Sequence, residues 1–138
     1  MDLVMDANIF FAALLHDGIT RALMLDPYLT LFAPRMILKE VDAHKERLIN
    51  KAKLNKERFE FILLLLQSKI TLVSEYSYGR YLKEAATFCP DEDDIEYFAL
   101  ALMLGYPLWS NDKALKNQQA VHVFSTDELL KMLEDRPG

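Results

Sequence analysis

Short apolar runs alternate along the chain with longer segments whose apolar residues recur at helical spacing. Runs such as "DLVMD", "ITLVS" and "AVHVFS" have the length and content of buried strands. Strands that alternate with helices favour an α/β fold, here a three-layer α/β/α sandwich around a mostly parallel central sheet. The pattern predicts strands at 2–6, 28–33, 70–74, 107–110 and 120–125, and helices at 7–15, 19–25, 34–52, 56–67, 78–88, 93–104 and 127–133.

Several helix boundaries carry their own sequence signals. Pro34 suits the first turn of a helix, because its missing N–H needs no partner there. Asn55 is a typical N-cap residue, and Gly105 is a typical C-terminal stop. Ser125 and Glu128 have the spacing of a capping box before the last helix.

Length and composition indicate a globular chain. The 138 residues fit a single domain, 1–138, and the hydrophobic fraction of 51% argues against disorder. Apolar runs such as 62–66 are too short to span a membrane, and the first residues lack the basic segment of a secretory signal. With a single cysteine, Cys89, no internal disulfide can form. We therefore expect a cytoplasmic protein without a membrane partner.

The formal net charge of −5 is unusual for a protein that grips nucleic acid through a broad basic surface. Two interpretations remain open at this point. Either the partner is not nucleic acid, or some acids hold cations while the basic residues act locally.

Two acids follow predicted strands directly. Asp6 closes the first strand, and Asp112 follows the strand at 107–110. Helix capping explains Asp6 and turn chemistry explains Asp112. However, parallel sheets bind ligands at the carboxyl ends of their strands, which is where both residues lie.

Other acids lie on helices that reach the same edge. Glu40 borders the apolar stripe of the helix at 34–52, and Asp94 tops the buried face of the helix at 93–104. Asp91 is a natural N-cap, with Asp94 at the capping-box position. His44 is better explained as a side chain on the flank of its helix than as a ligand.

If the strands are parallel, Asp6, Glu40, Asp94 and Asp112 can converge at one edge. Carboxylates only a few ångströms apart repel one another, and a divalent cation removes that cost. Oxygen ligands without a Cys or His cluster favour Mg²⁺ or Mn²⁺ over Zn²⁺.

Four short motifs resemble those of the PIN-domain family, the ribonucleases that include the VapC-like toxins. These are "LVMDANIFFAAL", "APRMILKEV" and, for the third and fourth motifs together, "DIEYFALALMLGYPLWSND". Their order and spacing cover the chain from Asp6 to Asp112. Two positions depart from the pattern: Ala7 replaces a hydroxyl residue, and Asn111 stands where glycine is frequent.

The resemblance implies Mg²⁺- or Mn²⁺-dependent cleavage of single-stranded RNA. It assigns metal binding and catalysis to Asp6, Glu40, Asp94 and Asp112, and supporting roles to Asn8, Ser110 and Asp91. One cation would be held mainly by Asp6, Asp94 and Asp112, with a second near Glu40. RNA contacts would fall to scattered bases, namely Arg35, Lys39, Lys113 and Lys116. The resemblance also implies an antitoxin partner and a homodimer. The apolar residues of helices 7–15 and 55–66 are candidates for the dimer contact. Core burial explains these residues equally well.

Two other functions fit parts of the pattern. A receiver domain also gathers acids around Mg²⁺, but it needs a phosphoacceptor Asp after a central strand and a Lys after a late one. Here Ser74 ends the middle strand, and the last strand has no Lys. A non-catalytic module that binds RNA or protein through the same fold is the alternative kept, and such a module would tolerate metal removal.

Overall fold

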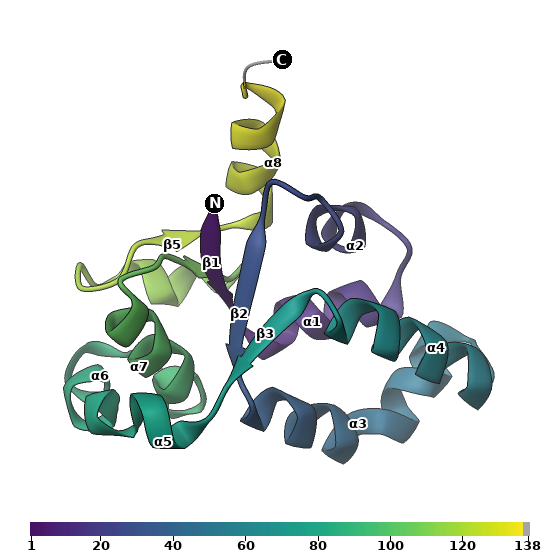
Figure 1. Ribbon diagram of the computed structural model, residues 1–138, viewed down its shortest axis with the longest axis horizontal. Helices are drawn as coiled ribbons and strands as arrows, with labels where there is room; N and C mark the ends of the chain where they lie inside the picture. Colours follow the sequence, from purple (N-terminus) through teal and green to yellow (C-terminus); the bar gives the residue numbers. More distant parts are fainter. Residues whose placement is uncertain (137–138) are drawn as a thin grey trace.

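The computed structural model describes residues 1–136, and its five strands form one parallel sheet in the order β3-β2-β1-β4-β5 (Figure 1). This confirms the predicted α/β/α sandwich with a parallel sheet. The strands are β1 (Asp2–Met5), β2 (Thr30–Pro34), β3 (Ile70–Val73), β4 (Leu108–Trp109) and β5 (Val123–Phe124).

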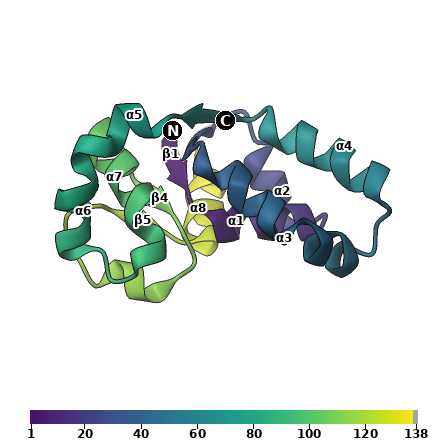
Figure 2. The same ribbon diagram turned by 90° about the horizontal axis from the view of Figure 1, so that it is seen from below.

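Helices cover both faces of the sheet. One layer holds α1 (Ala7–Leu15), α2 (Ile19–Met24), α3 (Met36–Ala52) and α4 (Lys56–Gln67). The other holds α5 (Glu75–Tyr78), α6 (Leu82–Phe88) and α7 (Ile95–Leu104), with α8 (Thr126–Glu134) following β5 (Figures 1 and 2). Three short 3₁₀ helices complete the chain, η1 (Gly79–Tyr81), η2 (Glu92–Asp94) and η3 (Lys113–Lys116).

The central strand β1 explains why the first strand has no polar face. Leu3, Val4 and Met5 are fully buried, because β1 has strands on both sides and helices above and below it. The strand order changes direction next to β1, where β2 lies on one side and β4 on the other. Such a switch point is the usual place for a ligand site in an open parallel sheet.

The capping predictions for Asn55, Gly105 and the Ser125–Glu128 pair are confirmed. The Asn55 Oδ1 accepts a hydrogen bond from the Arg58 amide at 2.7 Å. Gly105 ends α7 in the left-handed region with φ 70°, which a side chain would disfavour. Ser125 and Glu128 form both hydrogen bonds of the capping box that begins α8.

Several boundary predictions were wrong, among them the strand expected at 120–125, which is only Val123–Phe124. Pro34 is the last residue of β2 rather than the first turn of a helix, and α3 begins at Met36. The helix expected at 78–88 begins earlier and is interrupted by η1. The helix expected from residue 93 begins as the 3₁₀ turn η2, so the capping-box role expected for Asp94 is absent.

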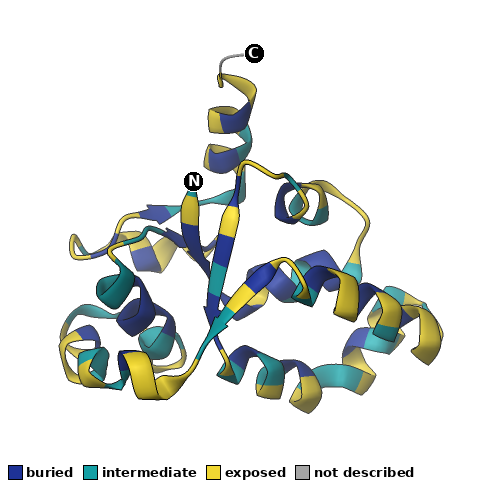
Figure 3. Cartoon of the chain, in the orientation of Figure 1, coloured by how far each residue is buried: buried dark blue, intermediate teal, exposed yellow. Residues whose placement is uncertain are grey.

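Helix α4 is less buried than its two apolar faces suggest. Phe61 and Leu64 are 62% and 65% exposed, and Leu65 is also exposed (Figure 3). Because α4 packs on α1 and α3 at the outside of its layer, only one of its faces is covered. Within residues 1–136 no helix combines the length and apolar content needed to cross a bilayer.

Candidate metal centre

Asp6 is a buried carboxylate at the end of the central strand. It is only 3% exposed, and its Oδ1 accepts a hydrogen bond from the Ile9 amide at 3.0 Å, which caps α1. Burial raises the pKa of Asp6, and hydrogen bonds from the Ser110 hydroxyl and the Ile9 amide oppose that rise. The negative charge of Asp112 raises the same pKa further. Asp6 is therefore both a helix cap and part of a charged cluster.

The end of β4 brings Ser110 and Asp112 beside Asp6. The Asp6 amide donates a hydrogen bond to the Trp109 carbonyl at 3.2 Å, which joins the ends of the two strands. Ser110 is 1% exposed, and its Oγ accepts a hydrogen bond from the Asp112 amide at 3.1 Å. The Asp112 Oδ1 accepts from the Ala114 amide at 3.0 Å and thereby caps η3. The Ser110 hydroxyl thus contacts the Asp6 carboxylate and the Asp112 backbone amide.

Three acids form the tightest group. Asp91, Asp94 and Asp112 each offer a carboxylate oxygen within 4.8 Å of the others, and we call these three residues the acidic triad. Asp91 precedes η2, where its Oδ1 accepts from the Asp93 amide at 2.9 Å. Asp94 ends η2, so this single turn places two acids on one side of the triad. The turn η2 therefore both precedes α7 and brings Asp91 and Asp94 into the triad.

Electrostatics make the triad unfavourable without a cation. Burial together with the charges of Asp6, Asp91 and Asp112 raises the pKa of Asp94 to about 7. None of the ion pairs within residues 1–136 involves Asp6 or a member of the triad. Oxygen donors at this spacing, without a cationic side chain paired to them, suit a hard divalent cation.

Glu40 lies apart from the triad, on the wall of an adjoining cavity of about 470 Å³ that Asp94 and Asn8 also line. Its Oε1 accepts a hydrogen bond from the Tyr97 hydroxyl at 2.9 Å. Burial raises the pKa of Glu40, and the bond from Tyr97 opposes that rise. The structure thus brings Asp6, Asp94 and Asp112 together, whereas Glu40 lies outside the triad and shares with Asp94 only the lining of the adjoining cavity.

Two aromatic side chains, Tyr97 and His44, also line the Glu40 cavity. Tyr97 was not expected to contribute to the site, although a tyrosine hydroxyl three residues after Asp94 on an apolar helix was an available signal. His44 lines the same cavity as Glu40, where the Phe11 ring meets it edge-on at 5.7 Å.

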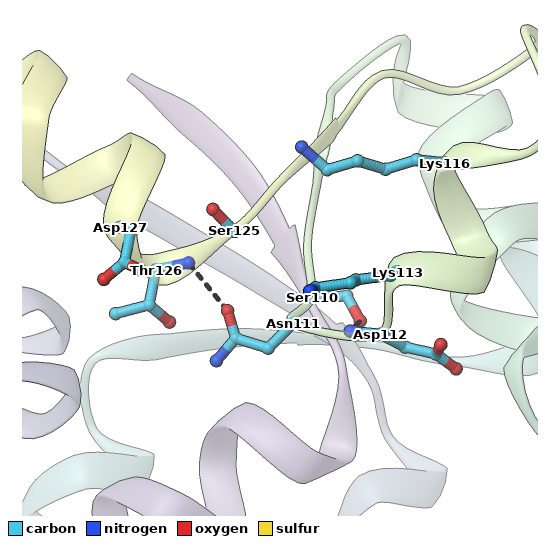
Figure 4. Close-up of a pocket in the computed structure, with 8 residues that line it drawn as sticks. All are labelled: Ser110, Asn111, Asp112, Lys113, Lys116, Ser125, Thr126 and Asp127. Atoms are coloured by element: carbon cyan, nitrogen blue, oxygen red, sulfur yellow. Dashed lines mark hydrogen bonds between the residues drawn. The ribbon is translucent and has the colours of Figure 1, made fainter.

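A second cavity, of about 540 Å³, borders the triad at Asp112 (Figure 4). Ser110 and Asp112 belong to its lining, together with Lys113 and Lys116 of η3 and the first residues of α8. The Asn111 Oδ1 accepts a hydrogen bond from the Thr126 amide at 2.8 Å, as the dashed line in Figure 4 shows. The residue that replaces the frequent glycine of the motif therefore ties η3 to α8.

The parallel sheet with a switch point beside β1, and the carboxylates that converge at the strand ends, are features that the resemblance implied. The family model described as "PIN domain" matches residues 4–134. The chain belongs to the PIN-domain family.

Comparison with solved structures supports the same fold. The structure described as VapBC2 from Rickettsia felis, bound to a DNA fragment from their promoter, contains a similar chain, with a TM-score of 0.65. The match covers 91% of this chain and 98% of that chain at 16% sequence identity, so it carries the fold alone. No curated protein sequence matches the chain.

Proposed function

We propose that this chain is a Mg²⁺- or Mn²⁺-dependent endoribonuclease that hydrolyses phosphodiester bonds of single-stranded RNA. The observation that carries the proposal is the convergence of Asp6 with the acidic triad at the ends of β1 and β4. Membership of a family of nucleases supports it.

The residues at this site suit a divalent cation in number and chemistry. Asp94 and Asp112 would hold it with Asp6, and Asp91 supplies a further oxygen donor on the exposed side. When bound, the cation supplies an activated water and neutralises negative charge on the phosphate. Glu40 would hold a second cation in the adjoining cavity, which Asp94 also lines.

The remaining residues orient these acids. The Ser110 hydroxyl positions Asp6 relative to Asp112, and the Ile9 amide restrains the Asp6 carboxylate. The Tyr97 hydroxyl restrains Glu40. Asn8 is exposed on the cavity wall, where it can contact substrate. No side chain of the chain needs to act as a covalent nucleophile.

We further propose that the protein is the cytoplasmic toxin of a toxin–antitoxin pair and that it forms a homodimer. The likeness to a VapBC chain motivates the antitoxin partner. The exposed apolar residues Phe61, Leu64 and Leu65 of α4 are candidates for a protein contact of either kind. Co-expression with the product of the adjacent gene, followed by size-exclusion chromatography, tests both statements.

The test of the activity is cleavage of single-stranded RNA in Mn²⁺ by a nuclease-free preparation. We expect cleavage to stop in EDTA and in Asp6→Asn, while the Tm of the variant stays at or above that of the wild type. Wild-type cleavage by Asp6→Asn would remove the assigned role of Asp6.

The alternative is a PIN-like module that binds RNA or protein without turnover. RNA binding that persists in EDTA, with no cleavage in Mn²⁺ or Mg²⁺, would favour this alternative over the nuclease.

A further inference from the structure

Two cavities flank the acidic triad, and they differ in charge. The cavity on the Glu40 side shares Asp94 with the triad, and the cavity between η3 and α8 shares Asp112 with it. Because each cavity shares a residue with the triad, a nucleic acid strand whose scissile phosphate lies at the triad can continue into either of them. Their linings therefore decide the direction that the strand takes.

The Glu40 cavity is unfavourable for a polyanion. Its lining includes one guanidinium, that of Arg47, and the imidazole of His44. Against these stand five carboxylates, those of Glu40, Glu92, Asp93, Asp94 and Glu96. Phosphates a few ångströms from such a wall would be repelled, even after a cation had neutralised part of the charge.

The cavity between η3 and α8 is far less negative. Its lining carries two carboxylates, Asp112 and Asp127, and the ammonium groups of Lys113 and Lys116. Even with Glu128, the partner of Lys116, three carboxylates face two ammonium groups here, against five carboxylates and one guanidinium in the Glu40 cavity. Figure 4 shows both lysine side chains extending from η3 toward the segment that begins α8.

The two lysines differ in their ion pairs. Lys116 forms an ion pair with Glu128, and Glu128 is also part of the capping box of α8. That pair fixes the Lys116 ammonium at the rim of the cavity. Lys113 is exposed and takes part in none of the ion pairs within residues 1–136, so its ammonium is available to a ligand.

We propose that the cavity between η3 and α8 binds the phosphodiester backbone of the RNA strand adjacent to the scissile bond, with Lys113 and Lys116 as its cationic contacts. The strand is thereby directed away from the Glu40 wall. This proposal rests on the proposed function, since it assumes that the triad marks the scissile phosphate.

The test is the salt dependence of RNA binding, measured by fluorescence anisotropy with a labelled single-stranded RNA oligonucleotide in EDTA. For one lost phosphate contact, the slope of log K against log salt should fall by about 0.7 in Lys113→Ala. The same relation predicts about fivefold weaker binding near 0.1 M salt, and a larger loss in Lys113→Glu.

Lys131→Ala is the matched control, because Lys131 is an exposed lysine of α8 outside both cavities. We expect it to keep the wild-type slope. Lys116→Ala should lower the slope as Lys113→Ala does, and circular dichroism checks that α8 survives the loss of the pair with Glu128. In cleavage assays with Mn²⁺, Lys113→Ala should raise KM and leave kcat near the wild-type value.

Three results would overturn the proposal, and they are distinguishable. Wild-type cleavage together with an unchanged slope in Lys113→Ala, or a larger loss in Arg47→Ala than in Lys113→Ala, would refute this path while leaving the nuclease assignment intact. A wild-type protein that neither cleaves nor binds single-stranded RNA would remove the proposed function and this path with it.

Discussion

Carboxylates in two regions of this molecule have opposite electrostatic surroundings. Around α8, a hydrogen bond from Lys116 lowers the pKa of Glu128 to about 2, and one from Arg136 lowers the pKa of Asp26. At the strand ends, burial and neighbouring acids raise the pKa of Asp6 and bring that of Asp94 to about 7.

The two regions differ in whether a cationic side chain accompanies the acids. In the α8 region the chain supplies the cation from its own side chains. At the triad it supplies oxygen donors, and the described ion pairs leave them without a lysine or arginine partner. Such a site costs folding free energy in the metal-free protein, which is a common feature of functional sites.

Removing a triad carboxylate should have the largest effect. Asp94→Asn loses a donor to the proposed cation, and metal-ion stabilisation of the transition state contributes several kcal/mol, so we expect cleavage to fall about 1000-fold. Isothermal titration with Mn²⁺ should show weaker binding in parallel. Near-wild-type cleavage and Mn²⁺ affinity in this variant would contradict the claim that the triad, unlike the acids around α8, binds a cation from solution.

The hydroxyl that restrains Glu40 should have an intermediate effect. Tyr97→Phe keeps the buried ring and removes only the hydrogen bond to Glu40. Groups that orient metal ligands typically contribute 10–100-fold, so we expect a loss of about 10-fold or more in cleavage with Mn²⁺. Tyr78→Phe is the matched control, since the Tyr78 hydroxyl donates to Glu96 instead. Equal losses in both variants would indicate a general packing effect.

The stability of the metal-free protein should depend on pH through Asp94. Because the folded pKa of about 7 lies above the usual value of 3.8, the folded state binds more protons between these values. The contribution of this group is therefore most favourable below about pH 4 and is lost as the pH rises toward 7. In EDTA at pH 8, Asp94→Asn should be more stable than the wild type.

Solvent screens part of the repulsion because Asp94 is only half-buried, so we expect about 1 kcal/mol, or roughly 4 °C in Tm for a chain of this size. Differential scanning fluorimetry of both proteins from pH 5 to pH 8 measures the change. A Tm difference that stays constant over this range would show that Asp94 does not titrate as proposed.

The smallest effect is expected in the region where the chain supplies its own cation. Asp26→Asn removes the partner of Arg136 at the surface, far from the triad in sequence and outside both cavities. Exposed ion pairs contribute little to stability. We therefore expect unchanged cleavage and a slightly lower Tm, the opposite sign to Asp94→Asn in EDTA. A rise in Tm would remove the contrast between the two regions.

The architecture could be predicted from sequence because its signals are local. Alternating strand and helix periodicity indicated the parallel sandwich, and capping residues such as Asn55 and Gly105 mark real helix ends. The helix start predicted at Pro34 was wrong because proline also fits the end of a strand. The sequence left open whether the apolar residues of α4 are core or exposed, because apolar spacing does not distinguish a core face from an uncovered one.

The site was predictable only in part. Acids at the ends of β1 and β4 were expected to converge, and the structure places Asp6 beside Asp112. The close approach of Asp91 depends on the 3₁₀ geometry of η2, which sequence patterns do not specify. The pairing of Glu40 with Tyr97 joins residues 57 apart in the chain, so no local pattern could reveal it.

The most direct measurement is anomalous X-ray diffraction from crystals soaked in Mn²⁺. We predict an anomalous peak within coordination distance of the Asp94 and Asp112 carboxylates, close to Asp6. A fully exchanged crystal with no peak there, or with its strongest peak elsewhere on the surface, would contradict the claim that these acids jointly hold a divalent cation.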